Sequence, residues 1–492
     1  PALPVDARTR LVAIVGEGNV RDDRLTRVTH AAGRSYPDLV RLRSGASLNP
    51  PDAVVYPGSR ERVAELLAAC AERRIAIVPF GGGTSVVGGV EALRGPHEAV
   101  ISVDLARLSG LLALDQRSQF ATLAAGTFGP DLERLLAERD HTLGHFPQSF
   151  EFSTVGGWAA TRSAGQASTG YGRIDELVVS LRAVTPAGEI ETRSVPASAA
   201  GPDLRDLLVG SEGALGIIID VTLRVRPRPP ARHYEAWSLP SFAAGTEALR
   251  ELEQSGAAPD VARLSDEEET RLSLTLSSGS LATRAFRAYL SARGRANACL
   301  AIVGFEDSEA RIARRRRAAR TVLRRHGGLD LGSAPGNTWL KGRYHGPYVR
   351  DELLTRGVLV ETLETATTWT ALRDTHRAVG DGLRAALAAR GTPARVMCHV
   401  SHLYPTGASL YFTFLARQQR GAELEQWQAA KSAACDAIIA AGATITHHHA
   451  IGRDHAPWLP GEIGDVGVQA LRAAKERLDP VGIMNPGKLL PE

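Results

Sequence analysis

The sequence predicts an α+β protein with two main lobes, and three observations support this fold class. The chain has 492 residues, and a single hydrophobic core stops growing at roughly 250–300 residues. Short β-rich runs alternate with helical segments in the first half, whereas alanine-rich helices dominate the second half. The intervening segment Arg226-Pro-Arg-Pro-Pro230 predicts a stiff linker. We therefore expect four parts: a helical lead-in at 1–50, a first lobe at 51–228, a second lobe at 229–440 and a C-terminal segment at 441–492.

The elements of the first lobe follow from short apolar runs and from helix signals. Each predicted strand is a short run of mainly apolar residues, and one predicted helix carries a proline in its first turn. The predicted strands lie at residues 54–56, 75–78, 99–103, 120–124, 177–184 and 217–225, and the predicted helices at 60–73 and 130–139.

The second lobe is predicted to contain an antiparallel sheet with helices on one face. Its strands are expected near residues 298–304, 358–364 and 410–414, and its alanine-rich helices at about 241–256, 306–326, 367–390 and 420–441. The C-terminal segment is expected to begin with a strand at 443–446 that leads into three histidines. A helix should follow at 466–478.

A glycine-rich loop directly follows the predicted strand at 75–78. Residues 79–89 read Pro-Phe-Gly-Gly-Gly-Thr-Ser-Val-Val-Gly-Gly. Glycine permits close approach of the backbone, and successive N–H groups form a nest for an anion. The loop lacks the lysine of a Walker motif and the third glycine of a Rossmann fingerprint. It therefore predicts a phosphate or pyrophosphate nest of another kind, with a purely structural turn as the alternative.

Two further segments combine glycines, small residues and hydroxyl groups at the edges of apolar runs. The first spans residues 147–165, and the second begins as Gly210-Ser-Glu-Gly-Ala-Leu-Gly216. A single phosphate needs one such loop, whereas a long phosphate-bearing cofactor needs contacts at several points. The three segments together favour a large cofactor over three unrelated turns.

Composition narrows the class of protein. The apolar fraction of 43% and the charged fraction of 23% are ordinary for a globular protein. The net charge of +4 is small for this length and gives no reason to expect a nucleic-acid partner. The four cysteines are scattered without a Cys-x-x-Cys pair, so we expect no disulfide framework and a cytoplasmic location. No apolar run reaches the roughly 20 residues of a transmembrane helix.

Five segments, in this order and spacing, resemble the alkyldihydroxyacetonephosphate synthase family within the vanillyl-alcohol oxidase/PCMH flavoprotein superfamily. The resemblance extends from about residue 50 to the C-terminus. The first and third segments are shared across the superfamily, and the second and fifth are more particular to the synthases. They read Pro79-Phe-Gly-Gly-Gly-Thr-Ser85, Ser149-Phe-Glu-Phe-Ser-Thr-Val-Gly-Gly-Trp158, Gly210-Ser-Glu-Gly-Ala-Leu-Gly216, Tyr404-Pro-Thr-Gly-Ala408 and His447-His-His-Ala-Ile-Gly452.

The resemblance implies a PCMH-type FAD-binding lobe of two subdomains and an α+β cap domain with an antiparallel sheet. It also implies FAD bound non-covalently, with the pyrophosphate on residues 79–85 and the substrate placed over the flavin by the cap. The implied FAD contacts are Pro79, Phe80, Gly81, Gly82, Gly83, Thr84, Ser85, Pro147, Ser149, Ser153, Thr154, Gly156, Gly157, Thr161, Arg162, Ser163, Ala164, Glu212, Gly213, Ala214, Leu215, Gly216, Ile217 and Ile218.

The family reaction exchanges the acyl chain of acyl-dihydroxyacetone phosphate for a long-chain alcohol, without net redox change, and forms an ether-lipid precursor. It needs an acid/base near the substrate carbon, cations for the phosphate and an apolar channel. Tyr404 matches the family's acid/base tyrosine. The triplet His447, His448 and His449 supplies titratable groups near neutral pH. If 443–446 is a strand, His447 and His449 share one face.

Two arginines are candidates for the substrate phosphate, because a guanidinium binds such a group with two hydrogen bonds. By resemblance, Arg350 matches an arginine expected to hold the phosphate. Arg263 matches a second functionally sensitive arginine. For both arginines, the structural alternative is a surface or interdomain salt bridge. For Tyr404, the structural alternative is an ordinary tyrosine in a turn.

Two other functions stay open. The ending Met484-Asn-Pro-Gly-Lys488 looks more like FAD-dependent dehydrogenases, so an oxidase or dehydrogenase of a 2-hydroxy acid or other alcohol is the alternative enzyme. A non-enzymatic protein, either a flavin-binding scaffold or a cofactor-free binding protein, is the third hypothesis. Those dehydrogenases bind a divalent metal, and His399 matches one ligand. Tyr411 and His448 replace other ligands, so we expect no metal here.

The expected partner is a small lipid or hydroxy-acid substrate, with no nucleic acid. By analogy with the family, we also expect a homodimer and peripheral contact with a membrane.

Overall fold

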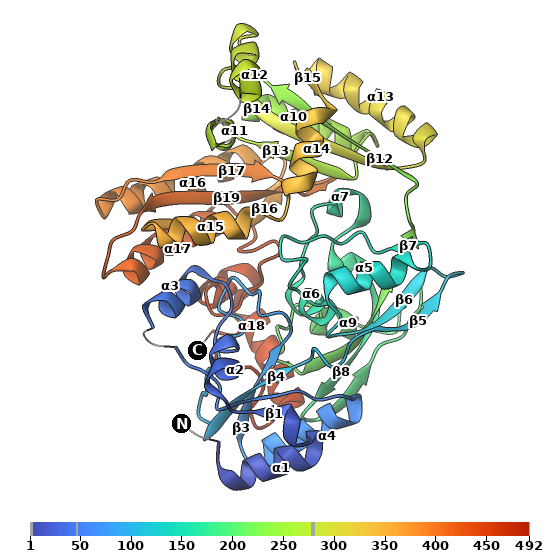
Figure 1. Cartoon of the computed structure of the whole chain (residues 1–492), viewed down its shortest axis with the longest axis vertical. Coiled ribbons are helices and arrows are strands. Elements are labelled where there is room, and N and C mark those ends of the chain that lie inside the picture. The colour runs from blue at the N-terminus through green and yellow to red at the C-terminus, as the bar shows by residue number, and fades with distance from the viewer. Residues whose placement is uncertain (1–2, 46–47, 277–280, 492) are drawn as a thin grey trace. The chain divides into compact units, whose positions relative to one another are not determined.

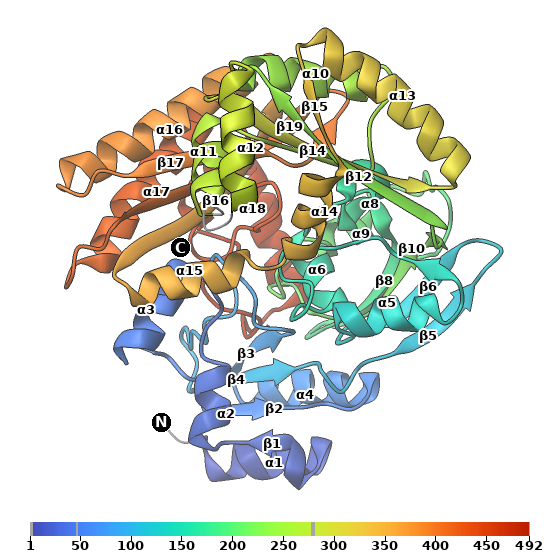
Figure 2. The same cartoon turned by 45° about the horizontal axis from the view of Figure 1, so that its top comes forward.

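The computed structural model of the chain describes residues 3–45, 48–276 and 281–491, which divide into two compact units (Figure 1, Figure 2). The first unit consists of Pro1–Ala164, Arg173–Arg228 and His448–Glu492, and the second of Gly165–Gly172 and Pro229–His447. Residues 1, 2, 46, 47, 277–280 and 492, which the predicted parts include, lie outside the described residues. The chain passes between the units at residues 164/165, at 172/173, at 228/229, which lies within the segment predicted as a linker, and between His447 and His448.

The first unit contains a small, mostly parallel sheet. Its strand order is β1 (Val20–Arg21), β2 (Ala53–Val55), β4 (Ala99–Asp104) and β3 (Ile75–Phe80). The β2–β4 and β3–β4 pairs are parallel, and α4 (Arg60–Glu72) makes the crossover from β2 to β3. All residues of β2 and β4 are buried, as continuous apolar runs in a parallel sheet should be. This sheet places the end of β3, and with it the glycine loop, at its edge.

A second sheet of the first unit is antiparallel throughout. Its order is β5 (Leu111–Asp115), β6 (Phe120–Ala124), β10 (Ile217–Arg224), β8 (Val178–Thr185) and β9 (Gly188–Glu191). Part of the predicted linker forms β11 (Arg226–Pro227), which pairs with β7 (His141–Thr142). The helices of this unit are α1 (Val5–Val15), η1 (Glu17–Asn19), α2 (Arg24–Thr29), α3 (Tyr36–Ser44), α4, α5 (Gly129–Ala137), α6 (Val155–Thr161), α8 (Ile174–Leu177), α9 (Leu204–Leu208), η2 (Ala456–Trp458) and α18 (Leu459–Leu478).

The second unit contains the predicted antiparallel sheet. Its order is β15 (Leu329–Gly332), β12 (Ala231–Leu239), β14 (Cys299–Asp307), β13 (Val261–Ser265), β17 (Arg395–Val400), β19 (Gly407–Arg417) and β16 (Val358–Thr368), and β18 (Leu403–Tyr404) pairs with β19. Every pair is antiparallel. The helices are α7 (Ser168–Tyr171), α10 (Phe242–Gln254), α11 (Glu267–Leu276), α12 (Leu281–Ala292), α13 (Glu309–Arg325), α14 (Ser333–Gly342), α15 (Gly346–Thr355), α16 (Leu372–Ala389) and α17 (Glu423–Ala440).

Helices cover both faces of this sheet, so the prediction of helices on one face was wrong (Figure 2). On β12, Glu235 forms an ion pair with Arg316 of α13 at 2.6 Å. The preceding residue, Tyr234, stacks on Trp339 of α14, with ring centroids 6.2 Å apart. Because side chains alternate along a strand, α13 and α14 lie on opposite faces. Residues 234–239 of β12 are buried on both faces of the strand, as expected for a strand between two layers.

The start of the C-terminal segment also differs from the prediction. Residues 443–446 form no strand, so the argument that strand alternation places His447 and His449 on one face fails. Instead, the edge strand β16 holds the segment: the Thr444 N–H donates to the Ala366 carbonyl at 3.1 Å, and the Thr365 hydroxyl donates to the Thr444 carbonyl at 2.5 Å. One backbone bond and one side-chain bond thus take the place of a regular ladder.

Candidate functional site

The glycine loop after β3 packs closely against the segment at 152–154. A Cβ atom on Gly82 would lie 1.5 Å from the Phe152 carbonyl oxygen, and one on Gly81 would lie 2.4 Å from Thr154 Oγ1. Gly83 has a φ of +63°, which favours glycine. Residues 81–86 are half-buried, so their backbone is accessible. The first two predicted cofactor segments therefore meet in the first unit, and only glycine allows this approach.

The third segment packs against both of the others. A Cβ atom on Gly213 would lie 2.7 Å from Pro79 Cγ. The Gly210 N–H donates to the Ala159 carbonyl, and the Glu212 N–H to the Ala160 carbonyl, each at 2.9 Å. All three segments thus form one cradle of close backbone contacts, as a long phosphate-bearing cofactor requires. Which atoms contact FAD stays a prediction.

Several predicted contact residues already have structural partners. Thr154 caps α6 by accepting the Gly157 N–H at 3.3 Å. The Ser153 hydroxyl donates to the Ser149 carbonyl at 2.9 Å and accepts the Trp158 indole N–H at 2.7 Å. Arg162 donates to the carbonyls of residues 206 and 209. Four predicted contact residues have side chains buried in the core, so we expect mainly their backbone groups to contact a ligand. These residues are Ala214, Leu215, Ile217 and Ile218.

His145 is a residue of this cradle that sequence reasoning missed. It is 1% exposed, its Nε2 lies 2.7 Å from the Ser163 hydroxyl, and its ring centroid lies 4.9 Å from that of Trp158. Burial, with a smaller contribution from His448, lowers the pKa of His145 to about 3, so the ring is neutral. Among the described residues, its Nδ1 has no hydrogen-bond partner. The only sequence signal was its position two residues before Pro147.

Glu212 connects the third segment to the C-terminal segment. Its buried carboxylate accepts the N–H groups of Ile451 and Gly452 at 2.8–2.9 Å. The Asn485 amide donates to the Glu212 carbonyl at 2.7 Å and to the Gly89 carbonyl at 3.1 Å. Burial raises the pKa of Glu212 to about 7, although the two N–H groups favour the ionised form. Its side chain therefore orients the segment after the histidines.

The second unit brings two predicted catalytic residues together. The Tyr404 hydroxyl and His447 Nε2 are 2.5 Å apart. Tyr404 is half-buried on β18, and Trp369 Nε1 donates to its carbonyl at 3.1 Å. His447 is 4% exposed. A short O–H···N contact between a phenol and an imidazole is suited to proton transfer.

The unit boundary divides the histidine triplet. His447 belongs to the second unit, whereas His448 and His449 belong to the first. The rings of His448 and His449 are 4.7 Å apart and meet edge to face. His448 lies near enough to His145 to lower the pKa of that ring electrostatically. The three histidines therefore have different surroundings, which their identical letters in the sequence hide.

Arg263 forms part of a polar triad in which His399 is buried and Arg263 and Glu269 are half-buried. Its Nη2 donates to Glu269 Oε1 at 2.8 Å, its Nη1 donates to His399 Nε2 at 3.1 Å, and His399 Nδ1 lies 3.0 Å from Glu269 Oε1. Burial opposes ionisation of Glu269, but His399 and Arg263 lower its pKa below the ordinary value. The ion pair of Arg263 lies within the second unit, so it is not the interdomain salt bridge named as an alternative. The role of Arg263 toward a substrate stays a prediction.

Arg350 lies on α15, with 14% of its side chain exposed. Burial raises the pKa of Glu361 on β16, and the nearby Lys431 and Arg350 oppose this effect. Burial likewise raises the pKa of Tyr411 to about 12, and Arg350 opposes it. The Tyr411 ring stacks on His399 at 4.8 Å. Tyr411 thus contacts the Arg263 triad through His399, and the charge of Arg350 lies near enough to Tyr411 and Glu361 to oppose the rise of their pKa values. We refer to these residues of the second unit as one polar cluster.

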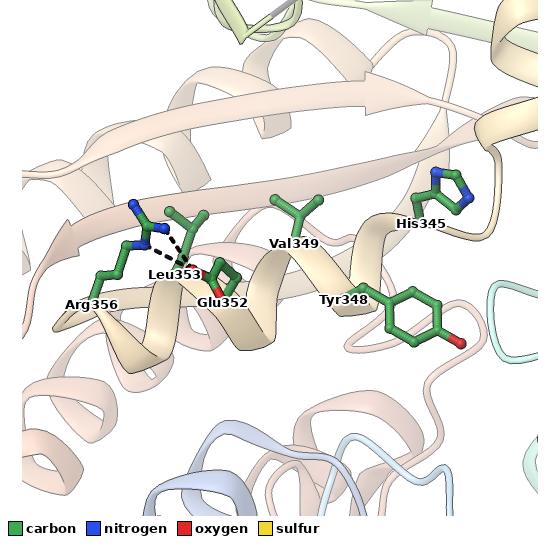
Figure 3. Close-up of a pocket in the computed structure, with 6 residues that line it drawn as sticks. All are labelled: His345, Tyr348, Val349, Glu352, Leu353 and Arg356. Carbon is green, nitrogen blue, oxygen red and sulfur yellow. Dashed lines mark hydrogen bonds and ion pairs between the residues drawn. The ribbon is translucent and has the colours of Figure 1, made fainter.

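A surface hollow of about 670 Å³ lies along α15 (Figure 3). Tyr348 and Val349 in its wall are 55% and 50% exposed, and Glu352 forms an ion pair with Arg356 at 2.7 Å. None of its six lining residues is a predicted site residue. The polar clusters, rather than this hollow, therefore define the candidate site.

The described part of the chain contains no helix that is both long enough and apolar enough to cross a bilayer. Peripheral contact with a membrane is not tested by this finding.

Comparison with known proteins gives two family matches. Residues 51–194 match the FAD binding domain, and residues 228–489 match the C-terminal domain of FAD linked oxidases. An alkyldihydroxyacetonephosphate synthase of Dictyostelium discoideum is 36% identical over 480 residues, which cover 96% of this chain and 78% of that protein. These matches confirm the resemblance predicted from the five segments.

Solved structures agree with the sequence comparison. A structure of an alkyldihydroxyacetonephosphate synthase superposes with a TM-score of 0.86 at 33% identity and covers 99% of this chain and 87% of that one. Substrate-bound p-cresol methylhydroxylase superposes with a TM-score of 0.73 at 15% identity, covering 98% and 96% of the two chains, and this shows a shared fold. A mitochondrial D-lactate dehydrogenase (cytochrome) of Arabidopsis thaliana is more distant. It is 26% identical over a match that covers 90% of this chain and 74% of that protein.

Proposed function

Because the chain belongs to the alkyldihydroxyacetonephosphate synthase family of FAD-dependent enzymes, we propose that it exchanges the acyl chain of acyl-dihydroxyacetone phosphate for a long-chain alcohol. The product is an ether-lipid precursor. The observation that carries this proposal is the 2.5 Å contact between the Tyr404 hydroxyl and His447 Nε2. This contact supports the proposal, because the family resemblance assigns catalysis to these two residues and the pair can donate and accept a proton.

The cradle of the first unit fits the cofactor. The Gly81–Gly83 turn has no room for side chains and leaves its backbone accessible, as binding of a pyrophosphate requires. We propose that this turn holds the pyrophosphate and that the segments at 147–164 and 212–218 hold the remainder of FAD without a covalent bond. When bound, FAD supplies an acceptor for a hydride equivalent.

Tyr404 and His447 are proposed to move the substrate proton. Transfer of the phenol proton to His447 Nε2 leaves a phenolate, which can accept a proton from the substrate carbon. When the reaction needs an acid, the proton returns by the same route. This relay keeps the proton within two side chains of one unit. His448 and His449, which lie in the first unit, are proposed to act on the FAD side of the reaction.

We propose that Arg350 is the main ligand of the substrate phosphate. Its guanidinium is always charged and can donate two parallel hydrogen bonds. Arg263 also carries a positive charge in this cluster, but Glu269 offsets that charge at 2.8 Å. Arg263 is therefore proposed as a second, weaker contact. A homodimer, peripheral contact with a membrane and a cytoplasmic location remain predictions, which light scattering, vesicle sedimentation and cell fractionation would test.

The test of the main reaction uses purified FAD-loaded enzyme with palmitoyl-dihydroxyacetone phosphate and hexadecanol. We expect ether product and free palmitate in equal amounts, with no electron acceptor required. The alternative function predicts a different result: a 2-hydroxy acid would bleach the flavin anaerobically, and an acceptor would restore it. Bleaching by a hydroxy acid without ether formation would reject the synthase proposal. The greater identity to the synthases makes the oxidoreductase alternative the weaker one.

A further inference from the structure

A buried carboxylate on β16 holds the segment that carries His447. Glu364 is 1% exposed. Its Oε2 accepts the main-chain N–H of His447 at 2.5 Å, and its Oε1 accepts the Thr446 hydroxyl at 2.6 Å. Because residues 443–446 form no strand, no regular ladder fixes this part of the backbone. The side chain of Glu364 therefore fixes the position of the His447 backbone.

The ring of His447 is fixed from a second direction. His402 is 4% exposed, and its ring stacks on His447 with centroids 4.8 Å apart and planes 26° apart. His402 Nδ1 lies 2.5 Å from the hydroxyl of Ser168, which is 8% exposed on α7. Ser168 thus orients His402, and His402 orients the plane of the His447 ring.

We infer that Glu364 and His402 are positioning residues for the Tyr404–His447 pair, an inference that rests on the proposed function. Proton transfer to His447 Nε2 requires the ring edge to face the Tyr404 hydroxyl. The hydrogen bond from the His447 backbone N–H to the Glu364 carboxylate fixes the backbone from which the ring extends. The stack on His402 fixes the plane of the ring. The negative charge of Glu364, which accepts the backbone N–H of His447, also favours the positive imidazolium formed by the transfer.

The titratable groups that face His447 within the second unit are few. Glu364 comes from β16, Tyr404 from β18 and His402 from the residues just before β18. Tyr411 of β19 lies opposite Glu364 in the strand register. Burial raises the pKa of Tyr411 to about 12, so it stays neutral through the range of the test. His448 and His449 follow His447 directly in the chain.

The experiment compares Glu364→Gln with Glu306→Gln in the FAD-loaded enzyme. Glu306 is a matched control: it is 6% exposed in the same unit and accepts the hydroxyl groups of Tyr171 and Tyr234 at 2.6 and 2.7 Å. Both variants are expected to lower the thermal midpoint. Only Glu364→Gln is expected to lower kcat, by about 10- to 100-fold, since a small misplacement of a reacting group costs that much. KM should change by less than about twofold.

A second readout does not depend on turnover. In protein labelled with 3-fluorotyrosine, Tyr404→Phe identifies the ¹⁹F signal of Tyr404, and its titration reports the Tyr404–His447 pair. Glu364→Gln should shift the acid-side midpoint of that signal to lower pH, because it removes the charge that favours the imidazolium. Glu306→Gln should leave the midpoint unchanged. If wild-type enzyme makes no ether, the proposed function fails, and this titration still tests the inference.

Results that would overturn the inference are specific. Unchanged kcat and an unchanged Tyr404 titration in a folded, flavin-bound Glu364→Gln enzyme would remove Glu364 from the positioning role. If that variant does not fold, Thr446→Val removes one donor to the carboxylate at constant volume, and it should lower kcat in the same direction by less. His402→Phe keeps a stacking ring and should retain more turnover than His402→Ala. Equal turnover in wild type and His402→Ala would remove His402.

Discussion

The carboxyl group of Glu212 is expected to make stability depend on pH in a direction opposite to that of an ordinary ion-paired carboxylate. Burial raises its pKa from 4.5 to about 7. A raised pKa means that folding favours the protonated form. The stabilising contribution is therefore fully present below about pH 4.5 and is lost as the pH rises through about 7. Because each pH unit corresponds to about 1.4 kcal/mol, the contribution is about 3 kcal/mol at most.

Glu212→Gln tests this reasoning, since glutamine resembles the protonated carboxyl group and its carbonyl can still accept the N–H groups of Ile451 and Gly452. Thermal unfolding of the flavin-free protein is measured between about pH 5.5 and pH 8.5. We expect the wild type to lose stability relative to the variant as the pH rises. With FAD bound, the same trend should appear in the rate at which flavin is released, because Glu212 orients the C-terminal segment beside the cradle.

Glu91→Gln is the matched control. Burial opposes ionisation of Glu91, but its bond with Arg453 lowers the pKa below the ordinary value. A lowered pKa gives stability that is present above about pH 4.5 and is lost only at lower pH. The difference between wild type and Glu91→Gln should therefore change little from about pH 5.5 to about pH 7. Above that range the nearby Lys488 titrates, because burial lowers its pKa to about 8. A constant difference for Glu212→Gln as well would refute the reasoning, since it would show that Glu212 does not titrate in this range.

Three further predictions concern the proposed reaction and the cradle. Tyr404→Phe should keep FAD but lower turnover by about 10²- to 10⁴-fold, the usual contribution of a general acid or base; unchanged ether formation would remove Tyr404 from this role. Arg350→Ala should weaken binding of the phosphorylated substrate most, and Arg350→Lys should restore part of it, as KM values would show. An equal loss with a neutral analogue would argue against phosphate recognition. Gly82→Ala should destabilise the protein and abolish flavin binding, because its Cβ would lie 1.5 Å from the Phe152 carbonyl oxygen. Gly18→Ala should leave flavin absorbance unchanged, because a Cβ atom added at Gly18 would meet no neighbouring atom within 4 Å.

Local patterns predicted most of the secondary structure. The apolar runs at 75–78 and 99–103 became the parallel strands β3 and β4 because such runs suit burial on both faces. The predicted helices at 60–73, 241–256 and 306–326 match α4, α10 and α13 within a few residues. The strand predicted at 443–446 was wrong, because β16 binds that segment through Thr365 and Ala366 rather than through a regular ladder. No local pattern contains that information.

The candidate site was predictable only in part. Tyr404 and His447 could be chosen from motifs, but their 2.5 Å contact joins residues separated by 43 positions. Glu364 carried no sequence signal that distinguished it from an ordinary core residue, and His145 carried only its position two residues before Pro147. Their importance follows from burial and from their partners, which are properties of the folded chain. The individual FAD contacts stay predictions.

The sequence by itself determined the cofactor through the family resemblance, which implies FAD, whereas Gly81, Gly82 and Gly83 after a buried strand alone predicted only a phosphate or pyrophosphate nest. It also determined the family, through five segments in a given order. The tertiary structure decided which groups act together. It divided the histidine triplet between two units and placed the Glu364 carboxylate within hydrogen-bond distance of the His447 backbone N–H. Local backbone preferences depend on neighbouring residues and can be predicted from the sequence. Hydrogen bonds between residues that are distant in the sequence form only when the chain folds.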